Sequence, residues 1–153
     1  MTEASETFER LYREQGARLW RSLFAFSGDP EVASDALAEA FAQALARGTA
    51  IVNPDAWIWT GAFRIAAGLL NARRRSVPAG TDVSYEMPTS AVDLIAALSR
   101  LPPKQRLAIV LHDYADRPTD EVARALGSSK ATVHVHLSQG RRRLRAMLED
   151  PDE

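Results

Sequence analysis

The residues best suited to contact a nucleic acid lie between Pro118 and Arg145. From Val122 to Leu148 the sequence has six Arg or Lys residues and no Asp or Glu. Cationic side chains bind phosphates, and the polar side chains beside them reach the edges of bases or adjacent phosphates. For the second role we predict Ser129, Lys130, Thr132, His134 and His136, and for backbone phosphates Arg141, Arg142 and Arg143.

The same stretch has the pattern of a helix-turn-helix. A first helix is expected at 119–126, and Gly127 follows where the chain must adopt a positive φ. Ser129 is a good cap for a second helix, on which Val133 and Leu137 fall four residues apart and face back onto the first. Such a helix is suited to a DNA major groove, and the alternative is a helical hairpin with a solvated charged face.

Apolar periodicity predicts helices in the rest of the chain as well. Residues 76–90 break this pattern with Pro, Gly, Ser and Thr, which predicts a flexible linker. We therefore expect an all-α chain with a helical domain at 1–75, a linker at 76–91 and a second helical domain at 92–153. The predicted helices outside the helix-turn-helix span residues 8–26, 30–47, 54–75, 90–99 and 102–114.

Composition argues against several other classes of protein. The chain has no Cys, a net charge of −1 and no apolar run near the roughly 20 residues that span a bilayer. Its first residues do not have the pattern of a signal peptide, so we expect a cytoplasmic protein without membrane insertion. His134 and His136 point about 200° apart on a helix and do not converge on a metal. No short catalytic signature is present, so we expect no enzyme activity, cofactor, metal or small-molecule substrate.

Several segments together resemble a known family. LPPKQRLAIVL at 101–111, DEVA at 120–123, ALG at 125–127 and RRRLR at 141–145 are similar to region 4 of bacterial RNA polymerase sigma factors. The resemblance is to the two-domain extracytoplasmic-function (ECF) group. Region 2 of that group resembles FERLY at 8–12, GDP at 28–30, DALAEAF at 35–41 and AWI at 56–58.

The resemblance implies partners and sites. Sigma factors of this group bind core RNA polymerase and promoter DNA, and an anti-sigma factor is a further possible partner. Region 4 would read the minus-35 element through the residues named above. Region 2 would bind core polymerase through Asp35, Glu39 and Gln43.

Region 2 would also assist opening of the minus-ten element, and aromatic rings can receive unstacked bases. The candidates for this role are Trp57, Trp59 and Phe63, with Arg64, Arg73, Arg74 and Arg75 for phosphates. We expect at least one of the three aromatic residues to be core packing instead.

Departures from the family pattern leave two alternatives open. His134 and Gln139 stand where the family commonly has basic residues, and the loop at 48–53 lacks aromatic residues. One alternative is a sigma-like adaptor that opens promoters poorly, and the other is a helix-turn-helix regulator that acts without polymerase.

Overall fold

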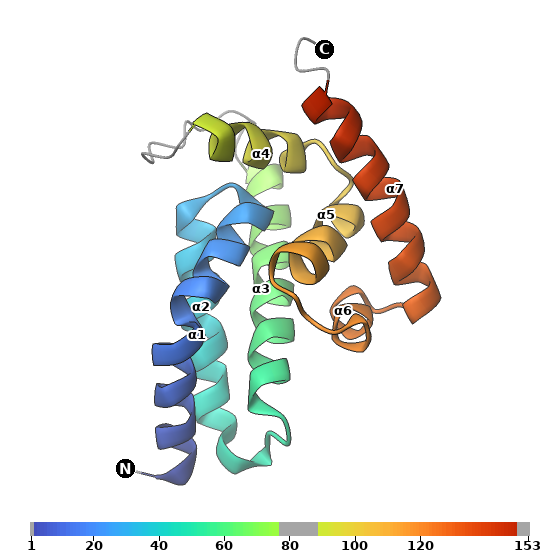
Figure 1. Cartoon of the computed structure of the whole chain (residues 1–153). Helices are drawn as coiled ribbons and strands as arrows, with labels where there is room; N and C mark the ends of the chain where they lie inside the picture. Colours follow the sequence, from blue (N-terminus) through green and yellow to red (C-terminus); the bar gives the residue numbers. More distant parts are fainter. Residues whose placement is uncertain (1, 77–88, 150–153) are drawn as a thin grey trace. The chain divides into compact units, whose positions relative to one another are not determined.

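The computed structural model describes residues 2–76 and 89–149, and it divides the chain into two compact units, Met1–Gly80 and Thr81–Glu153 (Figure 1). The described residues are helical and contain no strand, which confirms the all-α prediction. Most of the predicted linker, residues 77–88, lies outside the described part, so the domain limits stay a prediction.

The first unit is a bundle of three helices that all contact one another. A short 3-10 turn, η1 (Gly48–Ala50), lies between the second and third helices. The helices are α1 (Glu3–Ser27), α2 (Pro30–Arg47) and α3 (Pro54–Ser76).

Local capping chemistry sets the ends of these helices. Gly28 has a φ of 68° and donates its N–H to Phe24, which ends α1. The Asp29 carboxylate accepts hydrogen bonds from the first backbone N–H groups of α2, and Asn53 does the same for α3. The prediction that α1 starts near residue 8 is wrong, because Thr2 caps the helix by accepting a hydrogen bond from the Ser5 N–H at 3.1 Å.

Aromatic and aliphatic side chains fill the centre of this bundle. Small residues line the inner side of α2, which lets the three helices approach closely. The side chains that are almost fully buried include Leu19, Leu23, Phe26, Val32, Ala36, Ala40, Trp59 and Phe63.

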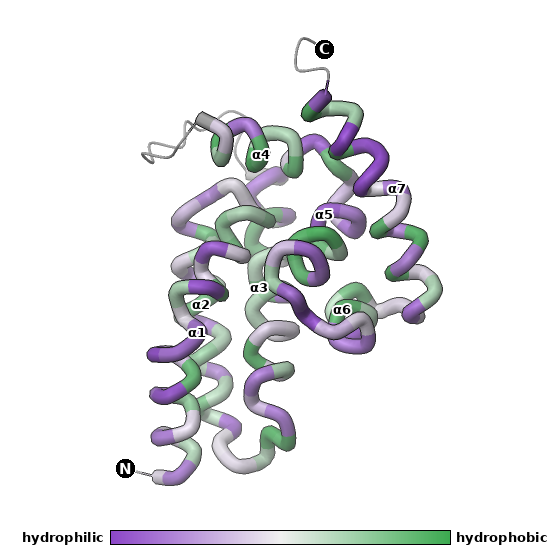
Figure 2. Tube along the Cα trace, viewed as in Figure 1, coloured by the Kyte–Doolittle hydropathy of each residue, from purple (hydrophilic) through white to green (hydrophobic). Residues whose placement is uncertain are grey.

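Within residues 89–149, the second unit has four α-helices and one turn of π-helix. Its elements are α4 (Thr89–Ser99), α5 (Pro103–Ile109), η2 (Val110–Tyr114), α6 (Thr119–Leu126) and α7 (Lys130–Glu149). Their hydrophobic side packs inward, and Figure 2 shows a largely hydrophilic stretch in the C-terminal half of α7.

The helix predicted at 102–114 is present, but it is not α-helical throughout. Its last turn is the π-helix η2. There Ala115 donates its N–H to Val110 at 2.9 Å, five residues back, and Asp116 adopts a φ of 56°. This wide turn displaces the side chains that follow Leu111 relative to a regular α-helix.

Two buried charged residues stabilise the turns of the second unit. Arg106 is 2% exposed and donates hydrogen bonds to the carbonyls of Ser99 and Leu101, between α4 and α5. The Glu121 carboxylate accepts paired hydrogen bonds from Arg117 at 2.5 and 2.8 Å. Across the described ranges, no helix is long and apolar enough to cross a membrane.

Candidate nucleic-acid interface

Helix α7 is presented by a helix-turn-helix, as the sequence predicted. Gly127 has a φ of 67° at the end of α6, and Ser129 Oγ accepts a hydrogen bond from the Thr132 N–H at 3.1 Å. Val133 and Leu137 are buried. The side of α7 that carries them packs on the unit's core, so the opposite side faces away from it.

The residues predicted to contact bases do not share one environment. Lys130 and His134 are exposed, whereas Thr132 and His136 are half-buried. The hydroxyls of Ser129 and Thr132 lie 3.0 Å apart and bond each other at the start of the helix. In the structure, Lys130 and His134 are therefore the members of this group whose side chains are most accessible to a ligand.

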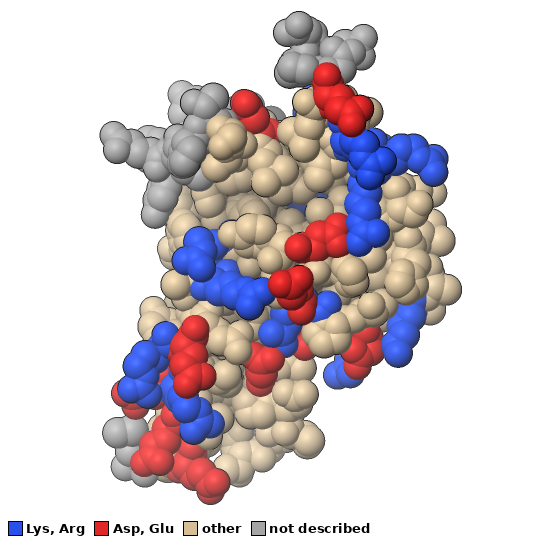
Figure 3. Space-filling view, viewed as in Figure 1, with Lys and Arg blue, Asp and Glu red and all other residues tan. Residues whose placement is uncertain are grey.

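The arginine run at 141–143 is also divided. Arg141 forms an ion pair with Asp113 at 2.5 Å, and Arg143 donates a hydrogen bond to the Gln105 side chain at 3.4 Å. Arg142 is exposed, with no hydrogen bond or ion pair among the described residues. Figure 3 shows basic side chains gathered over the C-terminal half of α7, where this run lies.

Acidic residues lie closer to this basic stretch than the sequence indicated. Asp113 pairs with Arg141, and Asp120 pairs with Arg124 at 3.1 Å. The hydrogen bond from Arg141 lowers the pKa of Asp113, although burial opposes the shift. Two of the six cations of this stretch, Arg124 and Arg141, are therefore paired with acidic residues that precede it in the sequence.

The three aromatic candidates on α3 separate clearly. Trp59 and Phe63 are each 1% exposed and lie in the core, and the Trp59 indole N–H donates to Gln15 at 2.9 Å. Their burial makes them packing residues in this structure, so neither presents a face for a base. Trp57 is half-buried, with the Arg47 guanidinium 5.5 Å from its ring centre.

The basic candidates on α3 differ as well. Arg64 and Arg74 are exposed. Arg73 forms ion pairs with Asp29 and, at 2.6 Å, with Glu31, and the hydrogen bond to Glu31 raises the Arg73 pKa. It thereby ties α3 to the start of α2. The side chain of Arg75 lies outside the described part of the chain.

On α2 the predicted polar row is solvent-accessible. Asp35, Glu39 and Gln43 are all exposed and recur every four residues. Gln43 donates a side-chain hydrogen bond to Glu39 at 3.0 Å, which aligns two of the three. The row offers a partner three polar side chains in line along one side of a helix.

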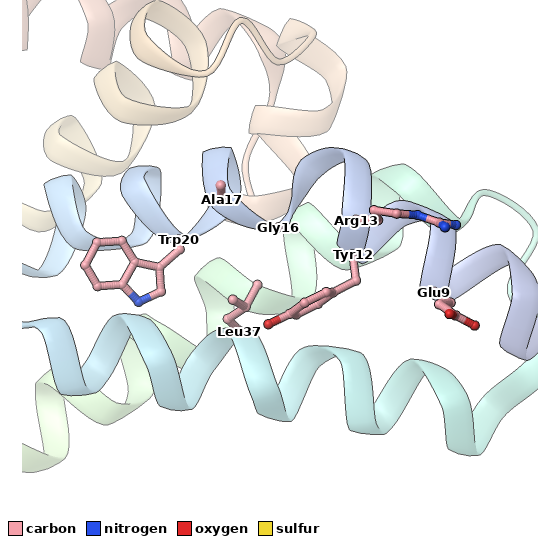
Figure 4. A pocket seen from close by; sticks show the side chains of 7 residues that line it. All are labelled: Glu9, Tyr12, Arg13, Gly16, Ala17, Trp20 and Leu37. Carbon is pink, nitrogen blue, oxygen red and sulfur yellow. The ribbon is translucent and has the colours of Figure 1, made fainter.

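A hollow between α1 and α2 was not predicted from the sequence. It has a volume of about 580 Å³, and Figure 4 shows Tyr12 and Trp20 on α1 beside Leu37 on α2. Glu9, Arg13, Gly16 and Ala17 complete its lining. Exposed Val135 on α7 was not predicted either, although its position two residues from buried Val133 marks it as outward-facing.

Comparison with known proteins identifies the family. Residues 91–144 match the family model described as Sigma-70, region 4. The chain is 32% identical to the RNA polymerase sigma-E factor of Streptomyces avermitilis, over 95% of this chain and 87% of that protein. It is also 32% identical to the ECF RNA polymerase sigma factor SigJ of Mycobacterium tuberculosis, over 84% of this chain but 48% of the relative's length.

A solved structure shows the same fold. The sigma factor RpoE of Bartonella quintana, crystallised with the anti-sigma factor NepR, superposes with a TM-score of 0.77 at 20% identity. The match covers 94% of this chain and 98% of that one.

The chain belongs to the RNA polymerase sigma factors, and its similarity to SigJ places it in the ECF group. Its function is accordingly that of a sigma factor in transcription initiation. The resemblance inferred from the sequence is confirmed, and neither the adaptor nor the regulator without polymerase is favoured.

Proposed function

We propose that this protein binds core RNA polymerase through α2 and brings it to promoters through α7, while α3 assists in opening the DNA. The observation that carries this proposal is the helix-turn-helix that holds the exposed outer side of α7 away from the core. The activity consists of binding and positioning, and the polymerase supplies the chemistry.

On α7, exposed Lys130 and His134 are the proposed contacts to base edges of the minus-35 element. Ser129, Thr132 and His136 lie beside them and complete the contact surface. Arg142 and Arg143 bind phosphates on either side of the groove, and Arg141 contributes less to phosphate binding because Asp113 neutralises part of its charge.

On α3, Trp57 is the proposed receiver of an unstacked base from the minus-ten element. It is the accessible member of the three aromatic candidates, and stacking supplies about 1–3 kcal/mol per base. Arg64, Arg74 and Arg75 bind the nearby phosphates. Trp59 and Phe63 hold α3 in the bundle, and Arg73 holds it against α2.

The exposed row of Asp35, Glu39 and Gln43 is the proposed contact with core polymerase. Two carboxylates at four-residue spacing suit a basic surface on a helical partner. We also propose that the protein acts in the cytoplasm and that an anti-sigma factor is a partner. The Bartonella quintana RpoE complex with NepR supports that partner by analogy of fold.

Transcription with purified core polymerase tests the proposal. The protein is added to core enzyme with fragmented genomic DNA, and the 5′ ends of the transcripts are sequenced. We expect starts that share an upstream sequence and depend on the added protein. Binding to core without specific starts would instead support the adaptor.

Charge reversal tests the α2 contact separately. Glu39→Lys is expected to weaken binding to core polymerase at least tenfold, because it places a cation against a basic surface. Glu14→Lys, an exposed residue on α1, is the matched control and should bind core as wild type does. Equal loss in both variants would overturn the assignment of α2.

A further inference from the structure

The outer side of α7 carries an apolar side chain that the base-contact set leaves out. Val135 is 51% exposed, more than any other large apolar side chain described in the second unit. It stands between buried Val133 and Leu137, and residues two apart on a helix point about 200° apart. Val135 therefore lies on the side of α7 turned away from the core.

The surface around Val135 is uncharged. Its neighbours at three and four residues along the helix are Ala131, Thr132, Ser138 and Gln139. Figure 3 shows mostly uncharged surface over the middle of α7, with basic side chains over its C-terminal half. A neutral centre flanked by cations is complementary to a groove floor of bases between two rows of phosphates.

Position along the helix points to the same ligand. Val135 is in the second turn of α7, which begins at Lys130, and N-terminal residues of a recognition helix meet base edges. In the major groove, the apolar group on base edges is the 5-methyl group of thymine. A valine has no hydrogen bond to offer a base, but it can exclude water from that methyl group.

We propose that Val135 is a specificity-determining residue that packs on a thymine 5-methyl group in the upstream promoter element. This inference rests on the proposed function of α7 in reading DNA. It adds a base preference to that function: the promoter DNA contacted by the second unit should contain at least one thymine.

Deoxyuridine isolates the contact, because it differs from thymidine only by this methyl group. Polymerase holding the full-length protein is bound to a promoter obtained by in vitro selection, and each upstream thymine is replaced singly by deoxyuridine. Loss of one buried methyl group predicts about fourfold weaker binding at one position. Val135→Ala should bind the thymine promoter more weakly than wild type does. At that position, its affinities for the thymine and the deoxyuridine promoter should be nearly equal, a ratio near one.

Two further variants make the result specific. Val135→Thr keeps the shape of the side chain but replaces one methyl group by a hydroxyl, and it should show a reduced ratio. Val92→Ala on α4, where the valine is 44% exposed, is the matched control and should keep the fourfold ratio.

The inference is overturned if no upstream thymine is sensitive to the replacement, or if Val135→Ala keeps the full ratio. A selected element without thymine in the protected segment also overturns it. In these cases transcription still starts at specific promoters, so the proposed function stands. Failure of the proposed function is distinct, since no specific start would then appear with wild-type protein.

Discussion

Asp113 and Arg141 form a paired contact between η2 and α7. Arg141 donates from Nη2 to Asp113 Oδ1 at 2.5 Å and from Nε to Oδ2 at 2.8 Å. His112 Nδ1 lies 2.8 Å from the same carboxylate. The hydrogen bond to Asp113 raises the pKa of Arg141, and both groups remain charged at neutral pH. One cation of the stretch proposed to bind DNA is thus partly neutralised within the protein itself.

Asp113→Asn should destabilise the second unit at neutral pH. The pair is partly exposed, so we expect a loss of about 0.5–1 kcal/mol. Since all three Trp residues lie in the first unit, hydrogen exchange of α7 amides is the appropriate measurement. Asp93→Asn, on an exposed position of α4, should leave α7 exchange unchanged.

The effect of Asp113 should depend on pH in one direction. Its folded pKa lies below the usual 3.8, so its contribution is complete above that value and is lost as pH falls through the folded pKa. The difference in stability between wild type and Asp113→Asn should shrink as the pH falls below about 4. A difference that persists undiminished in acid would show that the pair is not its source.

The salt dependence of DNA binding should separate Arg142 from Arg141. Arg142→Gln removes an exposed cation and should reduce the slope of log affinity against log salt by about 1. Arg141→Gln should reduce it by less, because Asp113 already neutralises part of that charge. Both are measured with the polymerase complex on one promoter, and equal reductions would mean that Arg141 leaves Asp113 on binding DNA.

Helix limits were predictable where the signal is local. Asp29, Asn53, Gly127 and Ser129 cap or end helices as their residue types require, because each bonds to backbone within four residues. The buried side of α7 followed equally from the spacing of its apolar residues.

Features that depend on distant partners were not predictable. Nothing in the spacing of Asp113 and Arg141 relates them, since their contact depends on η2 and on the packing of α5 against α7. Likewise three aromatic residues at 57, 59 and 63 could each have faced the core. Phe63 packs on Phe26 with 5.6 Å between ring centres, and Trp59 stacks on Phe63 at 6.3 Å, so these two of the three lie in the core.

Replacement of the two α3 tryptophans should destabilise the first unit to very different extents. Trp59→Ala opens a cavity and leaves Gln15 without its donor, so the first unit should lose about 3–5 kcal/mol. Trp57→Ala should cost about 1 kcal/mol or less, mainly its contact with Arg47. Denaturant unfolding followed by circular dichroism measures both.

Promoter opening should depend on the aromatic ring of Trp57 and not on the stability of the first unit. Permanganate reactivity of unpaired thymines should fall with Trp57→Ala and recover with Trp57→Phe, which keeps an aromatic face. Unchanged reactivity in Trp57→Ala would remove this residue from the opening step.

Two glycines should respond in opposite ways to the same substitution. In the middle of α7, a Cβ on Gly140 would lie 2.7 Å from Ile109 Cδ1 and 3.2 Å from Gln105 Cβ, where α5 crosses α7. The Ile109 end can rotate away but the Gln105 Cβ cannot, so Gly140→Ala should destabilise the second unit by about 1–2 kcal/mol. On α3, a Cβ on Gly68 would meet nothing within 4 Å, and Gly68→Ala should stabilise the first unit by up to about 1 kcal/mol. Hydrogen exchange resolved by unit measures both effects, and stabilisation by Gly140→Ala would show that α5 and α7 are not in close contact at this crossing.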